Sequence, residues 1–225
     1  MYFAPDQLYH VYNQGNNKQR IFYTRDNYLF FLSKLQRHLL PHCSILAWCL
    51  MPNHFHLMLR LKDAPSYSSD SKYSPGDYKH DVNPIYSPGD YKQDVHSHPV
   101  SKDEMSKRVS KEMATILRSY TRAINNQENR TGSLFRERTK AVCITCTDGV
   151  AKNWYMINGV TVIKVETPER QYPQICYRYI LNNPVAALLV TRAEDWEFSS
   201  ARDVMGLREG TLIDREVIKE YGLTF

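Results

Sequence analysis

The sequence predicts an α+β fold, with a central, mainly antiparallel sheet and helices packed on one face of it. Alternating residues predict a strand near 8–14, and two apolar runs broken at Met51-Pro52-Asn53 predict strands near 45–51 and 54–61. Neighbouring side chains on a strand point to opposite faces. Apolar residues recur at helical spacing over 25–40 and 103–127. Each helix then has an apolar stripe to bury, and one face of a sheet can cover both.

The boundaries of the first elements follow from local signals. The first strand ends at Gly15–Asn17, residues that favour a turn. In the helix that follows, Asp26 is a candidate N-cap and Pro41 limits the continuation. The next two strands are separated by Met51–Asn53, which predicts a tight connection between them.

Residues 63–102 interrupt this pattern, because they are rich in Ser, Pro, Asp, Lys and Tyr and poor in aliphatic residues. The segment Tyr73–Val82 recurs with one change as Tyr86–Val95. Two polar copies are too few for a stacked repeat fold. We therefore expect one domain over residues 1–225, with a low-complexity surface insertion at about 63–102.

The composition is that of a globular protein, with 42% hydrophobic and 24% charged residues. No apolar run is long enough to span a membrane, and no secretory signal opens the sequence. Five Cys residues favour reduced thiols and a cytoplasmic location. The single CxxC motif, Cys143 to Cys146, lacks the second pair that structural zinc sites need. The net charge of +5 favours a polyanionic partner.

Two imidazoles lie one strand repeat apart in the third strand. His54 and His56 are expected on one face and Phe55 on the other. Such a pair could converge on one divalent metal, since imidazole is a common metal ligand. The spacing alone is equally met by two unrelated, half-buried His residues.

The second long helix is followed by the most basic segment of the chain. Four cations surround a Gly-Ser turn and Phe135 there: Arg130, Arg136, Arg138 and Lys140. The segment would bind phosphates, or it is a solvated loop. Arg118 and Arg122 lie one turn apart on the flank of the preceding helix.

Later elements are predicted with the same signals. Strands are expected over 141–147 and 160–165. Thr167 and Pro168 then begin a helix, as N-cap and first helical residue, and a short amphipathic helix lies around 214–221.

Three blocks occur in a fixed order along the chain: YHVYNQG at 9–15, MPNHFH at 51–56 and YILNNPV at 179–185, the last followed by Trp196 and Ser199-Ser200. Together they resemble the single-tyrosine HUH transposases, specifically the REP-associated tyrosine transposase-like group. The segment LFRERTK at 134–140 looks like the basic segment of that family. The resemblance covers the chain except for 63–102, much of 148–170 and the far C-terminus.

The resemblance implies a ferredoxin/RRM-like HUH fold and a metal-dependent nuclease that cuts and rejoins single-stranded DNA with hairpin-forming ends. It implies Tyr179 as the nucleophile of a 5′-phosphotyrosine intermediate. It also implies a divalent metal, Mg or Mn, bound by His54 and His56, with Asn183 as a third ligand. Arg178 and the basic segment would hold adjoining phosphates, and some relatives share a site across a homodimer.

Alternatives remain open for two of these roles. Tyr179 and Asn183 have the i, i+4 spacing that places both on one helix face. However, Pro184 disfavours helical geometry at Asn183, which could instead cap a new turn. Tyr120 and Tyr177 are rival nucleophiles, and Tyr120 lies on a core-like stripe.

Two other functions fit the same residues. The first is a non-catalytic or domesticated relative that only binds single-stranded nucleic acid. The second is a small metal-dependent hydrolase, which predicts a carboxylate ligand near the His pair; Asp63 is the nearest candidate.

Overall fold

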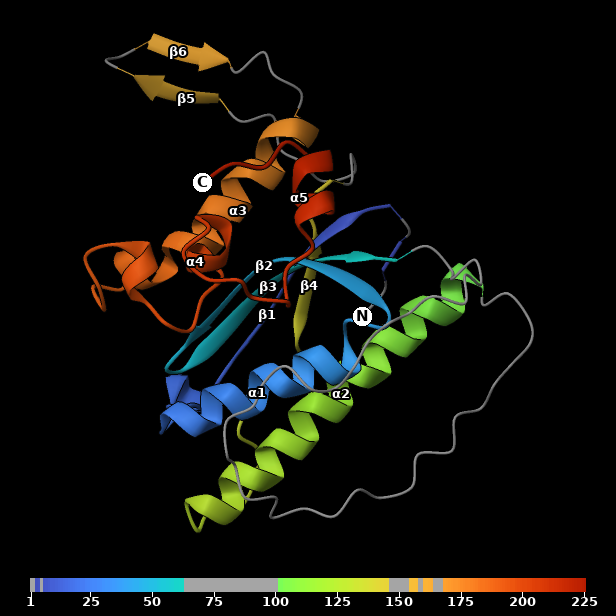
Figure 1. Ribbon diagram of the computed structural model, residues 1–225, viewed down its shortest axis with the longest axis vertical. Helices are drawn as coiled ribbons and strands as arrows, with labels where there is room; N and C mark the ends of the chain where they lie inside the picture. The colour runs from blue at the N-terminus through green and yellow to red at the C-terminus, as the bar shows by residue number, and fades with distance from the viewer. Residues whose placement is uncertain (1–2, 5, 63–100, 146–153, 158–159, 164–167) are drawn as a thin grey trace.

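The computed structural model spans residues 1–225 and describes all of them except 1–2, 5, 63–100, 146–153, 158–159 and 164–167. An antiparallel four-stranded sheet in the order β2-β3-β1-β4 forms its centre (Figure 1). The strands are β1 (Leu8–Gln14), β2 (Cys43–Met51), β3 (His54–Leu61) and β4 (Lys140–Cys143). The predicted α+β class and the three predicted N-terminal strands are confirmed.

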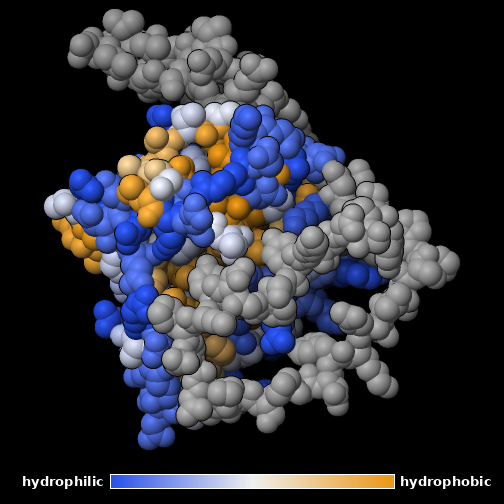
Figure 2. Space-filling view, viewed as in Figure 1, coloured by the Kyte–Doolittle hydropathy of each residue, from blue (hydrophilic) through white to orange (hydrophobic). Residues whose placement is uncertain are grey.

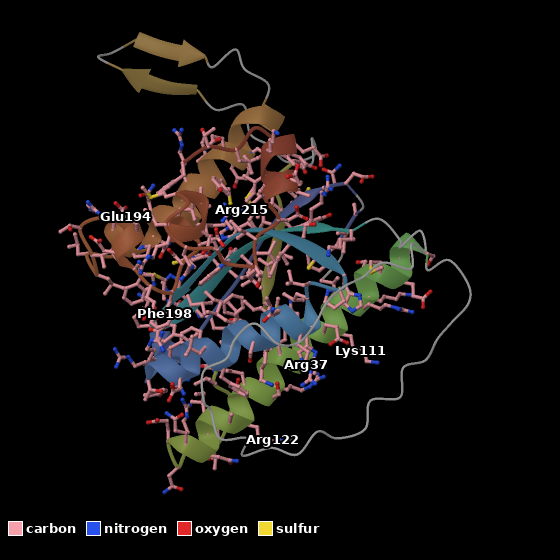
Figure 3. All side chains as sticks on the ribbon, in the orientation of Figure 1. Arg37, Lys111, Arg122, Glu194, Phe198 and Arg215 are labelled. Carbon is pink, nitrogen blue, oxygen red and sulfur yellow. The ribbon has the colours of Figure 1, made fainter. Side chains whose placement is uncertain are left out.

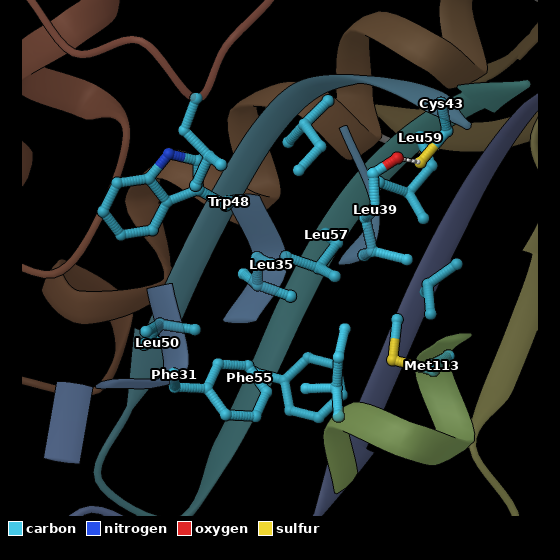
Figure 4. Packing of buried hydrophobic residues seen from close by; sticks show 14 of the residues in the cluster. Phe31, Leu35, Leu39, Cys43, Trp48, Leu50, Phe55, Leu57, Leu59 and Met113 are labelled. Atoms are coloured by element: carbon cyan, nitrogen blue, oxygen red, sulfur yellow. Dashed lines mark hydrogen bonds between the residues drawn. The ribbon is translucent and has the colours of Figure 1, made fainter. Parts of the chain in front are cut away.

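Helices α1 (Arg25–His38) and α2 (Lys102–Gln127) pack together on one face of the sheet, as expected (Figure 1). Their apolar stripes meet the strand residues of the same face in one buried cluster (Figure 4). The N-cap of α1 is Thr24 rather than Asp26, because the side chain of Asn27 accepts the backbone N–H groups of Tyr23 and Thr24. Asp26 lies in the first turn instead.

The opposite face of the sheet is covered as well. Helix α3 (Pro168–Ala186) crosses β2 and β3, with α4 (Ala201–Val204) and α5 (Arg215–Glu220) beside it (Figure 1). A second buried cluster fills this layer, including Tyr177, Ile180 and Leu181. The prediction that helices pack on one face of the sheet therefore holds for α1 and α2. Helix α3 packs on the opposite face, because it also has an apolar side to bury.

Helix α3 runs through both of its prolines, Pro173 and Pro184. The proposed new turn after Asn183 is therefore wrong, and Asn183 lies within the last turns of α3. Its carbonyl accepts the N–H of Ala187 at 3.0 Å. A proline removes only one donor, and packing against the sheet outweighs that loss here.

The C-terminal segment closes one edge of the sheet. Trp48 and Leu50 of β2 exchange backbone hydrogen bonds with Ser200 and Phe198. The ring of Phe198 also stacks on Tyr28 of α1, with centroids 3.8 Å apart (Figure 3). Since a bare edge strand invites pairing with other chains, this segment protects β2, whereas β4 forms the other edge of the sheet.

The remaining elements are short. They are the 3-10 helices η1 (Asn16–Lys18) and η2 (Ala193–Asp195) and the hairpin of β5 (Trp154–Ile157) and β6 (Val160–Ile163). The insertion expected at 63–102 lies outside the described residues except for its last two positions. There Ser101 caps α2 by accepting the N–H of Glu104, and Lys102 is the first helical residue.

Cys43, Cys49 and Cys176 are buried free thiols, but Cys143 is disulfide-bonded, which corrects the expectation of reduced thiols at that position. A small, odd number of Cys residues favours reduced thiols but does not exclude a disulfide between two of them. Among the described residues, no helix is both long and apolar enough to cross a membrane. In Figure 2, polar residues cover the visible lower end of α2, and apolar ones gather near α3 and α4.

Candidate active site

Strand β3 places the two expected imidazoles on the face that α3 covers. His54 lies opposite Gln14 of β1, and His56 lies opposite Tyr12. Their ring centroids are 4.9 Å apart. Phe55 points the other way, into the cluster under α1 and α2. The two apolar layers thus fix the direction of both imidazoles, because a shift of one residue would bury them in the wrong layer.

Asn183 of α3 brings a third polar group to this pair. Its Oδ1 lies 3.2 Å from Nε2 of His54, and its Nδ2 lies 3.5 Å from Nε2 of His56. The Asn183 side chain is buried, with 7% of the residue exposed. The Nε2 atoms of both imidazoles therefore face one amide from opposite sides.

Tyr179 lies one turn before Asn183 on the same helix. Its ring contacts His56 edge to face, with centroids 5.4 Å apart, and it lies 6.0 Å from the ring of His10. The residue is 50% exposed, and within the described part of the chain its hydroxyl has no hydrogen-bond partner. A phenol in this position is open to a substrate and stands beside the His pair.

The rival tyrosines are placed differently. Tyr177 is fully buried in the second cluster, and Tyr120 is fully buried in the first, where its hydroxyl donates to the carbonyl of Ile21 at 2.8 Å. Burial raises the pKa of both phenols, which opposes formation of a phenolate. Neither hydroxyl can reach a substrate without unfolding its layer.

The imidazoles of the site are held in their neutral form. Burial lowers the pKa of His56 to about 2 and that of His10 to about 4, and it also lowers the pKa of His54. The neighbouring imidazoles lower the pKa of His56 further. Neutral imidazole is the metal-binding form, so no proton has to leave these rings at neutral pH.

The donor set fits a divalent metal. Nδ1 of His54 lies 2.6 Å from the side-chain oxygen of Asn53, which can only accept, so His54 carries its proton on Nδ1. Nε2 of His54 and Oδ1 of Asn183 then face one another as two acceptors, an arrangement that a cation between them would relieve. With His56, the site offers two imidazole nitrogens and an amide oxygen. Nitrogen ligands suit Mn²⁺ better than Mg²⁺.

No described Asp or Glu side chain is among the groups that shift the pKa of His54 or His56. Among the described residues, no group of three or more His, Cys, Asp or Glu side chains is placed to hold a metal. Asp63, the carboxylate that an unrelated hydrolase would need, lies outside the described residues.

A basic groove of about 870 Å³ lies between α2 and the segment 133–141. Its cations are Arg118, Arg122, Arg136, Arg138 and Lys140, and its single acidic lining residue is Glu137. None of the five cations forms an ion pair with another described residue. We call this feature the basic groove; Figure 3 labels Arg122 on its α2 wall.

Buried Asn13 of β1 fixes the wall of the basic groove that follows α2. Its amide donates to the carbonyl of Arg136 at 3.2 Å and to Oγ1 of Thr139 at 2.9 Å. Lys140 then enters β4 opposite Tyr12, which is itself opposite His56. Directly opposed residues share a face, and strands lie about 4.8 Å apart, so Lys140 and His56 are about 10 Å apart in one row.

Two of the basic residues expected to bind DNA lie elsewhere. Arg130 follows α2 but does not line the basic groove. The guanidinium of Arg178 faces the C-terminus and donates to the carbonyl of Thr224 at 3.3 Å. Conversely, Arg118 and Arg122 line the basic groove although they were not predicted to bind DNA. His10, to which the motifs assigned no role, contacts His56. The two-residue repeat of β1 places His10 on the same face as Tyr12, which is opposite His56, so the sequence contained a signal for this position.

No protein-family model matches this sequence, and no curated protein matches it. Among solved structures, the fold is similar to that of a REP-associated tyrosine transposase bound to a REP hairpin. The sequences are 14% identical, the match covers 92% of this chain and 82% of that chain, and the TM-score is 0.45. That protein bears the name of the group that the sequence motifs resemble.

Proposed function

We propose that this protein is a metal-dependent endonuclease and strand transferase for single-stranded DNA, with Tyr179 as its nucleophile. One observation carries the proposal: an exposed phenol stands beside two neutral imidazoles and a buried amide that converge from two elements. All four groups belong to one chain, so we propose that one chain suffices for the chemistry.

In the proposed step, Oη of Tyr179 attacks a backbone phosphorus atom. The bond from Oη to phosphorus forms as the bond from phosphorus to O3′ breaks, which leaves a 5′-phosphotyrosine and a free 3′-OH. The phenol loses its proton to solvent, and the departing O3′ gains one. The covalent link conserves the phosphodiester, so a 3′-OH can reverse the step without an energy source.

His54, His56 and Asn183 would hold a divalent ion, Mn²⁺ or Mg²⁺, whose chemistry is to polarise the scissile phosphate. The residues themselves provide orientation. The β3 register fixes the imidazoles, and the i, i+4 spacing on α3 fixes the phenol relative to the amide. Burial of the two His residues keeps the ligands neutral and ready to bind.

We propose that the basic groove holds the backbone of the same DNA, including the stem of a hairpin. Among the described residues none forms an ion pair with its cations, and phosphate contacts dominate nucleic-acid affinity. Lys140 lies at the end of the groove that shares a strand row with His56. A strand leaving the groove over the β4 edge would therefore meet the His pair.

The test is incubation of the protein with single-stranded oligonucleotides, with and without predicted hairpins, in the presence of Mn²⁺. Covalent protein–DNA adducts are expected on denaturing gels, with mass spectrometry placing the nucleotide on Tyr179. Tyr179→Phe should lose the adducts, because it removes only the hydroxyl. His54→Ala and His56→Ala should also lose them but keep most single-strand binding.

Tyr177→Phe is the matched control, because it makes the same change two positions earlier on a buried ring. The hydroxyl of Tyr177 has no hydrogen-bond partner among the described residues, so its removal should cost little. Adducts that persist in Tyr179→Phe and vanish in Tyr177→Phe or Tyr120→Phe would refute the assignment of the nucleophile. An absence of adducts with all substrates would refute the reaction.

A non-catalytic single-strand binder is the second candidate, because the basic groove does not depend on the His pair. In that case binding persists, and neither Mn²⁺ nor Tyr179 affects it. Loss of DNA binding on mutation of the groove, without any adduct in the wild type, would favour this candidate.

A further inference from the structure

His10 contacts His56 from the neighbouring strand, and neither the motifs nor the proposed chemistry assigns it a task. Its Nε2 lies 2.8 Å from Nδ1 of His56, and the two rings are stacked with centroids 5.0 Å apart. His10 is opposite Met58 in the register, so the contact is a diagonal one across the β1–β3 ladder. This short contact fixes the ring of His56 on the side away from Asn183.

Two neutral imidazoles joined from Nε2 of one ring to Nδ1 of the other must have the same tautomer, because one of these nitrogens carries its ring's proton and the other is bare. The partners on either side decide the direction. Nδ2 of Asn183 is a donor and lies toward Nε2 of His56, so a proton on that Nε2 would face another donor. The proton of His56 then belongs on Nδ1, where it points at His10.

We infer that His10 is a positioning residue: it accepts the Nδ1–H of His56 and holds His56 in the tautomer whose Nε2 lone pair faces Asn183. His10 consequently carries its own proton on Nδ1. The inference rests on the proposed function, since a fixed lone pair matters because His56 is a metal ligand there. Asn53 does the same for His54, whose Nδ1 it engages at 2.6 Å.

The geometry separates this task from that of a third ligand. A metal ligand would direct a nitrogen at the space between His54, His56 and Asn183. The Nε2 of His10 instead points at the far nitrogen of His56, and its ring is stacked on that imidazole. Hydrogen bonds of this kind to the second nitrogen of a ligand orient it and typically change metal affinity about 10- to 100-fold.

The first measurement is made on metal-free protein. Two-bond ¹H–¹⁵N correlation spectra of ¹⁵N-histidine-labelled protein show which nitrogen of His56 carries the proton. We expect Nδ1 in the wild type, and a shift of the proton toward Nε2 in His10→Phe, which keeps a flat ring but removes the acceptor. A wild-type His56 protonated on Nε2 would overturn the inference directly.

The second measurement is Mn²⁺ affinity by isothermal titration calorimetry. His10→Phe should bind Mn²⁺ about 10- to 100-fold more weakly. His10→Gln can place an amide oxygen near the position of Nε2 and should recover most of the affinity and the Nδ1 proton of His56. Rescue by Gln but not by Phe distinguishes positioning from simple packing.

Tyr12→Phe is the matched control, because Tyr12 lies on the same strand as His10. Its ring centroid lies 5.8 Å from that of His56, and its hydroxyl forms no hydrogen bond with His56. This variant should leave both the tautomer and the affinity unchanged. Equal Mn²⁺ affinity in His10→Phe and the wild type would refute the inference. A wild type that binds no Mn²⁺ refutes the proposed function instead, whereas the tautomer measurement still decides the role of His10.

Discussion

The side-chain oxygen of Asn183 lies 3.2 Å from Nε2 of His54, although 129 positions of sequence separate the two residues. Helix α3 packs on β2 and β3 through Tyr177, Ile180 and Leu181, all of them buried. The contact between Asn183 and His54 is therefore a consequence of how two apolar surfaces meet. The contribution of Asn183 to metal affinity can be tested directly.

Asn183→Ala should weaken Mn²⁺ binding by at least about 10-fold, because it removes the oxygen that completes the donor set. Asn183→Asp keeps an oxygen at the same position and adds a negative charge, so it should bind Mn²⁺ at least as tightly as the wild type. Calorimetric titration of both variants measures this. Equal affinities for Asn183→Ala and the wild type would exclude Asn183 as a ligand.

The basic groove should supply salt-dependent affinity for DNA. The double variant Arg118→Ala/Arg122→Ala is expected to weaken hairpin binding and to reduce the slope of log K against log salt concentration by about 1 to 2. Fluorescence anisotropy at several salt concentrations gives both quantities.

Lys111→Ala is the control for the groove, because Lys111 is an exposed cation of α2 that does not line it. Lys111→Ala should change the slope of log K against log salt concentration less than the replacement of Arg118 or Arg122 by Ala does. Equal effects of Lys111 and the two Arg residues would mean that only the net charge of α2 matters.

The buried His56 should make the metal-free protein less stable in mild acid. Its folded pKa is about 2, below the ordinary value of 6.5, so below pH 6.5 the unfolded chain binds a proton that the folded chain does not. Stability is then lost as the pH falls, by about 1.4 kcal/mol per pH unit for this residue. Urea unfolding in EDTA between pH 7.5 and 5 should show a shallower slope in His56→Gln. An unchanged slope would contradict the prediction.

The C-terminal segment depends on one buried carboxylate. Asp203 has a side chain 1% exposed and pairs with Arg208, which also donates to the carbonyls of Glu197 and Ser199. Arg208→Ala should lower the free energy of unfolding by about 3 kcal/mol, because it leaves the carboxylate buried and unpaired.

Arg192→Ala provides the comparison, since Arg192 is 66% exposed and its pairing with Glu194 is largely solvated. Its loss should cost no more than about 1 kcal/mol. Urea denaturation measures the free energy of unfolding of both variants. A similar loss in the two would show that the buried pair of Asp203 and Arg208 stabilises the protein no more than an exposed pair does.

The strands around the His pair and both long helices follow from local patterns in the sequence. Alternation in 54–61 fixed which face carries His54 and His56, because a strand has a strict two-residue repeat. The apolar spacing of 25–40 and 103–127 predicted helices, because a helix returns to the same face every 3.6 residues. The motif at 179–185 singled out Tyr179 and Asn183 as candidates for the site.

How those residues meet depends on the packing of elements that are distant in the sequence. The local rule for a residue before proline argued against a helical Asn183, but the packing of α3 on the sheet overrode it. Exposure separated Tyr179 from Tyr177, whereas the apolar stripe of 103–127 already indicated that Tyr120 is buried. His10 and Arg118 acquired their positions through the pairing of β1 with β3 and the docking of α2. Such contacts depend on surfaces that are distant in sequence, so no local pattern records them.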